Sequence, residues 1–134
     1  MQTAPLPVVA LTLGDPAGVG PELIARLRGQ TDATAHANIV LVGDAWLWAD
    51  GQKIAGVEVA TQPVRNFAEV RARADTRLPA WLPMDTVAAA QVVRGQAQAA
   101  GGASVLQVLN ACMEATQRGE VDAICFAPLN KFAM

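Results

Sequence analysis

Hydrophobic residues along the chain gather into short, almost continuous runs that alternate with longer stretches of helical periodicity. Such runs occupy residues 8–13, 38–43 and 121–127. Continuous apolar runs of this length are typical of strands that are buried on both faces of a parallel sheet. Between them, apolar positions recur three or four residues apart. The alternation predicts an α/β fold in which helices cover an open sheet.

Three helices are expected, at residues 21–27, 45–50 and 104–118. Pro21 suits a first helical position, and Asp44 is expected to cap the second helix. Gly51 and Gly119 are expected to end the second and third helices.

Weaker patterns fill the rest of the chain. They predict strands at residues 54–60 and 79–84, the second an edge strand because prolines bound it. Residues 66–74 form a short helix or an irregular crossover, and residues 91–102 form a polar loop or a frayed helix.

Bulk composition narrows the class of protein. The 134 residues are 52% hydrophobic and 16% charged, which favours one folded domain. A net charge of −2 gives no electrostatic reason to expect nucleic acid or an anionic membrane as partner. The sequence has no apolar run long enough to span a bilayer and no export signal. Its two cysteines lack CxxC spacing and suit a reducing compartment. We therefore expect a cytoplasmic protein.

A glycine- and proline-rich loop follows the first strand. Residues 11–23 read Leu-Thr-Leu-Gly-Asp-Pro-Ala-Gly-Val-Gly-Pro-Glu-Leu. A strand, a glycine turn and a helix N-terminus together expose backbone N–H groups to a ligand. However, the spacing of Gly14, Gly18 and Gly20 matches neither the dinucleotide fingerprint nor a P-loop. A tight turn without a ligand fits the spacing equally well.

Two charged residues are candidates for ligand contacts. Asp15 suits a substrate hydroxyl or a cofactor amide, and equally an Asx turn that satisfies its own loop. Lys131 follows the last apolar run, where it meets a substrate phosphate or carboxylate or is simply solvated. Open α/β sheets bind ligands beyond the carboxyl ends of their strands, where both residues are expected.

The sequence gives no metal site and no assigned catalytic residue. His36 is the single histidine, and it lies in a polar stretch that is expected to be exposed. One histidine cannot build a multi-histidine metal site, and no Ser or Cys is arranged for nucleophilic catalysis.

Two blocks of the sequence resemble one known family. Residues 11–23 resemble the N-terminal signature of the 4-hydroxythreonine-4-phosphate dehydrogenase (PdxA) family. Residues 119–131, Gly-Glu-Val-Asp-Ala-Ile-Cys-Phe-Ala-Pro-Leu-Asn-Lys, resemble its second block. The resemblance implies an α/β/α sandwich of the isopropylmalate/isocitrate dehydrogenase-like type, incomplete in this chain. Residues 1–134 would be a single α/β domain that corresponds to the N-terminal part of a longer two-domain dehydrogenase.

The resemblance also implies an activity. Family members oxidise a secondary alcohol with NAD or NADP and a divalent metal (Zn, Mg or Co), the namesake substrate being 4-phosphohydroxy-L-threonine of pyridoxal phosphate biosynthesis. They are homodimers that act on phosphorylated small molecules. The residues that the likeness places along the cleft, near cofactor and substrate, are Gly14, Asp15, Pro16, Ala17 and Gly18. Lys131 would lie at the edge of the cleft and contact the substrate.

The sequence departs from the family in one large respect. The three metal-binding histidines of the family, its His-Thr substrate pair and most of its cofactor contacts have no match here, and His36 does not replace them. We therefore expect a fragment that is inactive alone. Two alternatives stay open. One is a relative that oxidises a phosphorylated sugar acid or a dihydrodiol dicarboxylate; the other is a non-catalytic truncated paralogue that acts as a binding module.

Overall fold

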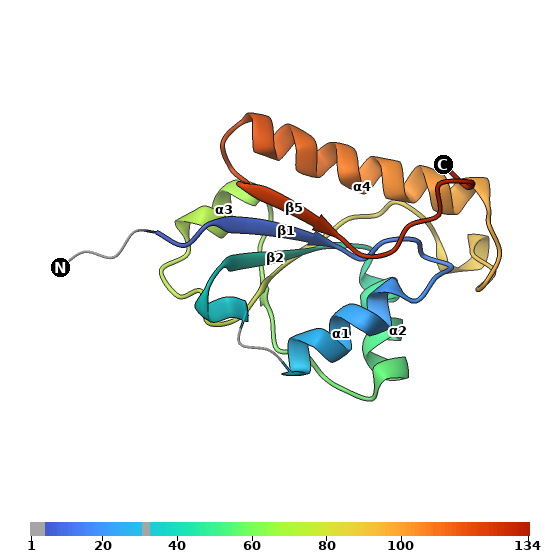
Figure 1. The fold of residues 1–134 in the computed structure, drawn as a ribbon, viewed down its shortest axis with the longest axis horizontal. Helices are drawn as coiled ribbons and strands as arrows, with labels where there is room; N and C mark the ends of the chain where they lie inside the picture. Colours follow the sequence, from blue (N-terminus) through green and yellow to red (C-terminus); the bar gives the residue numbers. More distant parts are fainter. Residues whose placement is uncertain (1–4, 31–32) are drawn as a thin grey trace.

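The computed structural model describes residues 5–30 and 33–134, which form a parallel sheet flanked by helices (Figure 1). The sheet has five strands in the order β3-β4-β2-β1-β5. Its strands are β1 (Val8–Thr12), β2 (Asn38–Gly43), β3 (Gln62–Pro63), β4 (Ala80–Pro83) and β5 (Ala123–Phe126). All four neighbouring pairs are parallel. The predicted α/β class is confirmed.

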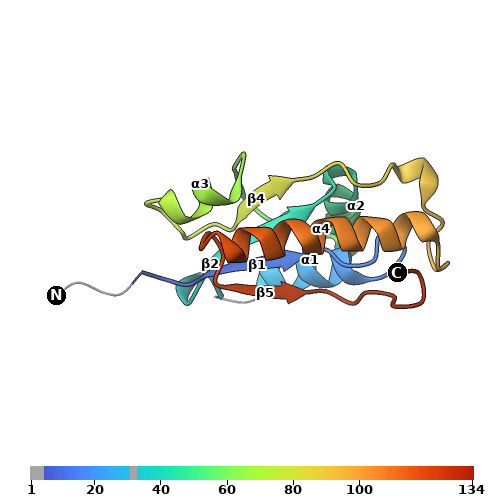
Figure 2. The same cartoon turned by 90° about the horizontal axis from the view of Figure 1, so that it is seen from above.

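Helices cover both faces of the sheet. They are α1 (Gly20–Gln30), α2 (Ala45–Ala55), α3 (Phe67–Ala72) and α4 (Ala99–Gln117), with short 3-10 turns at Ala33–Ala35 and Ala89–Gln91. Figures 1 and 2 show α1 and α2 on one face and α4 on the other. No helix among the described residues is long and apolar enough to cross a membrane.

The core has two halves because β2 is buried on both faces. Val40 and Val42 pack with α3 and α4, whereas Ile39 and Leu41 pack with α1 and α2. This alternation follows from the period of two along a strand. The predicted strand at residues 38–43 is confirmed with its bounds.

Strand order reverses beside β1. The chain passes from β1 to β2, forms the edge strand β3 and then β4 between β3 and β2, and returns through α4 to place β5 on the other side of β1. In doubly wound sheets this reversal leaves a crevice at the carboxyl ends of the two strands. Thr12 and Phe126, the last residues of β1 and β5, are register partners there.

The prediction that residues 121–127 are a buried strand was wrong in part. Val121 and Ala127 are buried, but β5 lies at the edge of the sheet and Phe126 is 56% exposed. Burial of a strand needs neighbours on both sides, and among the described residues β5 pairs only with β1.

The region after β2 corrects two further predictions. α2 continues through Gly51 to Ala55, so no strand occupies residues 54–60. Gly56 ends the helix instead, in the left-handed conformation at φ 71°. Gly51 serves packing, because a Cβ there would lie 2.6 Å from Cβ of Pro21 on α1.

The structure confirms some of the predictions for residues 66–102 and corrects others. A helix lies within residues 66–74, and Oδ1 of its cap Asn66 accepts the N–H of Glu69 at 3.0 Å. The strand predicted at residues 79–84 is confirmed as β4, but its predicted place at the edge of the sheet was wrong, since β3 lies outside it. α4 begins at Ala99, before the predicted start, because Gly101 and Gly102 are packed helix positions and not helix breakers.

Candidate functional site

The loops after β1 and β5 meet at the point where strand order reverses. The N–H of Asp15 donates to O of Pro128 at 3.0 Å. Gly14 has φ 80°, and a Cβ there would lie 2.5 Å from the same carbonyl oxygen. Only glycine combines this φ with so close an approach. The structure therefore brings together the two segments that the sequence singled out.

The glycine loop (residues 14–20) is folded on itself. Oδ1 of Asp15 accepts the N–H of Ala17 at 2.9 Å, and O of Asp15 accepts the N–H of Gly18 at 3.0 Å. This is the Asx turn that the sequence left open for Asp15. Oδ2 of Asp15 accepts no hydrogen bond within the described part of the chain. One carboxylate oxygen thus holds the loop and the other is available to a ligand.

The loop is pressed between α1 and α4. Pro16 and Ala17 are buried. A Cβ on Gly20 would lie 2.2 Å from O of Leu13, so α1 starts directly against the end of β1. On the other side, a Cβ on Gly101 would lie 3.4 Å from Oδ1 of Asp15. The side chain of Asp15 therefore lies against the first turn of α4.

The amide groups of the loop are less available than the sequence suggested. Asp15, Ala17 and Gly18 already donate their N–H groups internally. In the first turn of α1, the N–H groups of Gly20 and Glu22 have no acceptor within the helix, and Pro21 has no N–H. Glu22 stands in the same turn and opposes an anion there, although Arg94 lies 4.0 Å from its carboxylate.

Lys131 is exposed in a turn after β5, at the same edge of the sheet. No hydrogen bond or ion pair that the structure describes involves its side chain, and none joins it to Asp15. Oδ1 of the preceding Asn130 accepts the N–H of Phe132 at 3.0 Å. The structure thus places Lys131 near the candidate site without fixing its ammonium group.

The sequence interpretation missed a buried cluster of Asp44, Thr86 and Ser104. Asp44 is 2% exposed, and its carboxylate accepts the N–H of Thr86 at 2.8 Å and its hydroxyl at 2.5 Å. Oγ1 of Thr86 lies 2.6 Å from Oγ of Ser104 on α4. The cluster ties the ends of β2 and β4 to α4. Asp44 occupies the cap position of α2, but its side chain makes no cap hydrogen bond.

A second missed element is the segment at residues 92–98, which crosses the glycine loop. Its Gly95 donates N–H to O of Ala17 at 2.8 Å. Arg94 forms an ion pair with Asp50 of α2. A hollow of about 410 Å³ lies beneath, lined in part by Pro16, Trp46 and Arg94. The sequence did not predict this arrangement, because residues 92–98 show no helical or strand periodicity.

The described residues provide no metal centre. No three His, Cys, Asp or Glu side chains among them come together to hold an ion. His36 is exposed, as expected. Both cysteines are free, and burial raises the pKa of the Cys112 thiol to about 11. A thiol with so high a pKa is protonated at neutral pH and is a poor nucleophile.

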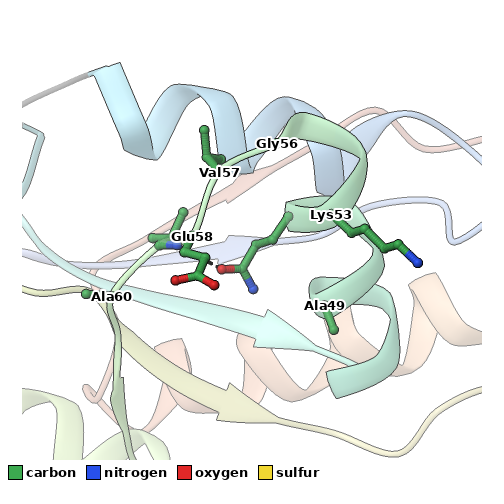
Figure 3. A pocket seen from close by; sticks show the side chains of 8 residues that line it. Ala49, Lys53, Gly56, Val57, Glu58 and Ala60 are labelled. Carbon is green, nitrogen blue, oxygen red and sulfur yellow. Dashed lines mark hydrogen bonds between the residues drawn. The ribbon is translucent and has the colours of Figure 1, made fainter.

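A larger hollow lies elsewhere, and its polar groups do not converge on one point. It has about 820 Å³ and lies between the C-terminal end of α2 and residues 57–60 (Figure 3). Because α2 runs back along the sheet from the end of β2, this hollow faces the amino-terminal side of the strands. Figure 3 shows Lys53 pointing away from Glu58, so its charged groups do not converge on a ligand.

Fold and site together define an α/β protein whose glycine loop lies where strand order reverses. A family model described as "Pyridoxal phosphate biosynthetic protein PdxA" matches residues 35–134. The chain belongs to the PdxA family, which confirms the resemblance drawn from residues 11–23 and 119–131.

Relatives and solved structures agree with this assignment. A curated protein of Pseudomonas aeruginosa, provisionally named 4-hydroxythreonine-4-phosphate dehydrogenase 2, is 38% identical over 135 residues, covering 100% of this chain and 39% of the relative. A crystal structure of a 4-hydroxythreonine-4-phosphate dehydrogenase from Burkholderia phymatum matches with TM-score 0.81 and 30% identity, covering 96% of this chain and 38% of that one.

A third match carries a different name. The crystal structure of a terephthalate 1,2-cis-dihydrodiol dehydrogenase from Burkholderia xenovorans LB400 has TM-score 0.72 and 26% identity, covering 96% of this chain and 36% of that one. The chain spans little more than a third of the length of the curated relatives that it matches.

Proposed function

We propose that this chain forms one wall of the active-site cleft of an NAD(P)-dependent, divalent-metal-assisted dehydrogenase. The reaction is oxidation of the secondary alcohol of 4-phosphohydroxy-L-threonine in pyridoxal phosphate biosynthesis. The observation that carries the proposal is the junction of the glycine loop with Pro128, at the reversal of strand order, in a chain of the PdxA family. Residues 1–134 then act as an α/β domain within a two-domain dehydrogenase.

The proposal assigns roles to the wall residues. Gly14, Pro16, Ala17 and Gly18 give a rigid surface near the cofactor and substrate. Asp15 accepts a hydrogen bond from a substrate hydroxyl or a cofactor amide through Oδ2, while Oδ1 holds the Asx turn. Lys131, exposed at the edge, meets the substrate phosphate or carboxylate as a mobile point charge. We assign none of these residues a role as general acid or base.

The proposed cofactors differ in how they fit this chain. A bound nicotinamide supplies the hydride acceptor, and the protein aligns it with the substrate. A metal does not fit the described residues, which contain no ligand cluster. The roles of the wall residues therefore do not depend on a metal ion. We expect this chain alone to reduce no NAD or NADP with 4-phosphohydroxy-L-threonine and added Zn²⁺, Mg²⁺ or Co²⁺.

Binding tests the proposal without turnover. Amide NMR spectra of the chain are followed during titration with 4-phosphohydroxy-L-threonine and with NAD⁺. We expect the Gly14, Asp15 and Gly18 signals to move, and D15N to weaken the effect. The exposed variant D85N is the control of equal charge change. Ligand-induced shifts confined to other residues would contradict the assignment of this wall, and no shift at all would favour a non-catalytic paralogue.

A second substrate class has one specific observation in its favour. The structural match to a dihydrodiol dehydrogenase supports oxidation of a cyclic dihydrodiol dicarboxylate. Such a ligand has carboxylates in place of a phosphate. Titration with a dihydrodiol dicarboxylate beside the phosphorylated amino acid decides between them, because the true class perturbs the glycine loop at lower concentration.

The proposed partner is a second copy of the chain in a homodimer, with no nucleic acid and no membrane. Val19, just before α1, and Leu23 and Leu27 on α1 support a self-association surface, since they are spaced four residues apart and are 58%, 42% and 48% exposed. The proposed location is the cytoplasm, which suits two free thiols.

A further inference from the structure

A polar hollow at the amino-terminal edge of the sheet lies at the opposite end from the glycine loop. It has about 290 Å³, and its polar lining comes from Asn38, Arg71, Arg73 and Thr76. Asn38 begins β2, and Arg73 follows the last turn of α3. We call this feature the amino-edge hollow. Nothing in the proposed dehydrogenase site uses it.

Arg73 is a half-buried cation held by neutral groups. Nη1 donates to O of Leu78 at 2.9 Å and to Oε1 of Gln62 at 3.3 Å. Nη2 donates to Oδ1 of Asn38 at 2.5 Å. No carboxylate in the described part of the chain forms a salt bridge with Arg73, and the nearby Asp75 pairs with Arg77 instead.

Arg73 also has N–H groups that donate no hydrogen bond within the described part of the chain. A guanidinium has five N–H groups, and the three hydrogen bonds of Arg73 leave two. Nε is buried and has no acceptor. Burial lowers the pKa of Arg73, and the nearby Asp75 only partly opposes this. An oxyanion in the hollow would supply the missing charge and an acceptor for Nη2.

The other polar groups of the hollow are also mainly donors. Nη2 of Arg71 lies 3.0 Å from Oδ2 of Asp122, and both side chains are about half exposed. The same Oδ2 also accepts the N–H of Val8 at 2.8 Å. Thr76 contributes a hydroxyl. Arg71, Arg73 and Thr76 line the same hollow, and guanidinium groups are the side chains with which proteins most often bind phosphate and carboxylate.

We propose that the amino-edge hollow is a binding site for a small oxyanion, a phosphate or a carboxylate group, held by Arg73 and Arg71 with Thr76. The site is separate from the proposed active-site wall. It lies beside the ends of β1 and β2 where those strands begin, so occupancy also stabilises that edge of the fold by mass action.

The test is an NMR titration at constant ionic strength, with inorganic phosphate in one arm and acetate in the other. We expect a saturable shift of the Arg73 Nε–Hε signal and of the Thr76 amide. R73Q raises the apparent Kd for phosphate about tenfold or more, since a charge-assisted pair is lost. R73K keeps the charge without the fork and gives a smaller increase. R65Q, which removes an exposed arginine just before α3, leaves Kd unchanged.

R71Q provides a second variant in case R73Q does not fold. It removes one guanidinium and leaves Asp122 without its ion pair, so phosphate binding weakens further by repulsion. Comparison of the two arms shows which oxyanion class the site prefers. A response that never saturates, or an equal response in R73Q and R65Q, would overturn the proposal.

The two sites give separate readouts. Phosphate that binds only at the glycine loop shifts Asp15 and Gly18 and leaves Thr76 and the Arg73 side chain unmoved. That result would sink the amino-edge proposal and leave the proposed function intact. Shifts only at Arg73 and Thr76 would support the amino-edge proposal and contradict phosphate recognition at the glycine loop.

Discussion

Asp15 and Pro128 are joined by one backbone hydrogen bond of 3.0 Å, although 113 positions separate them along the chain. The bond fixes the loop after β1 to the segment after β5. Because strand order reverses between these two strands, it closes one side of the crevice in which doubly wound sheets bind ligands. The geometry leaves no room for a side chain at Gly14.

Replacement of Gly14 by alanine is therefore expected to be strongly destabilising. An alanine at φ 80° costs about 1–2 kcal/mol, and its Cβ would also clash with O of Pro128. We expect the free energy of unfolding to fall by more than about 2 kcal/mol, measured by urea denaturation. Amide exchange at Asp15 should accelerate as its hydrogen bond is lost.

Gly56 offers a matched control for Gly14. It has φ 71°, but no heavy atom lies within 4 Å of an added Cβ. G56A therefore bears the conformational cost alone, about 1 kcal/mol. Equal losses of stability in G14A and G56A would contradict the claim that close approach to Pro128 dictates the glycine.

The Asp44 cluster predicts a second large effect. D44A removes the acceptor for the hydroxyl and N–H of Thr86 in a buried place, which costs about 2–3 kcal/mol. The free energy of unfolding checks this, with the exposed neighbour Asp85 as control through D85A. Because Thr86 also contacts Ser104, D44A should increase amide exchange in the first turns of α4. Loss of α2 with α4 unaffected would restore the simple capping role.

The sequence predicted best those elements whose burial is decided locally. β2 emerged with its bounds because six consecutive residues are buried on both faces, which leaves a continuous apolar run. The glycine loop also emerged, since a strand end, glycines and a helix-starting proline are adjacent in the chain. Its place at the carboxyl end of a strand followed once the strands were assigned, whereas the reversal of strand order beside β1 came from the structure.

The errors came from relations between distant residues. Gly51 has the sequence signature of a helix end, but its contact is Pro21, on another helix. Asp44 has the signature of a cap, but its partner Thr86 comes 42 residues later. β5 is apolar without being covered, because coverage depends on its neighbours and not on its own residues. None of these relations leaves a periodic pattern.

Self-association through α1 is a third prediction. Val19, Leu23 and Leu27 form an exposed apolar stripe. We expect the apparent mass of the chain in light scattering to rise with concentration, and the double variant L23S/L27S to reduce this rise. I54S changes an equally exposed aliphatic residue on α2 and serves as control. A concentration-independent monomer would remove the support for a homodimer through this face.

The two cysteines should differ sharply in reactivity. Cys112 is fully buried and Cys125 is exposed on β5. Iodoacetamide under native conditions is therefore expected to modify Cys125 and spare Cys112, as mass spectrometry of peptides would show. Modification of both at equal rates would indicate that the α4 face of the core opens readily.

Cys112 also gives a pH dependence of stability. Burial raises its pKa from 9.0 to about 11 in the folded chain, so above pH 9 the unfolded state loses the proton first. The contribution of protonated Cys112 to the free energy of unfolding is thus fully present below pH 9. It is lost as the pH rises toward 11, by up to roughly 2–3 kcal/mol. The chain has no tyrosine, so no phenol contributes to a decline in this window. Urea unfolding in reducing buffer at pH 8 to 11 measures the decline. C112A is less stable at pH 8 because a buried thiol is lost, but its stability should vary less with pH. An equal slope in C112A would assign the alkaline decline to other groups.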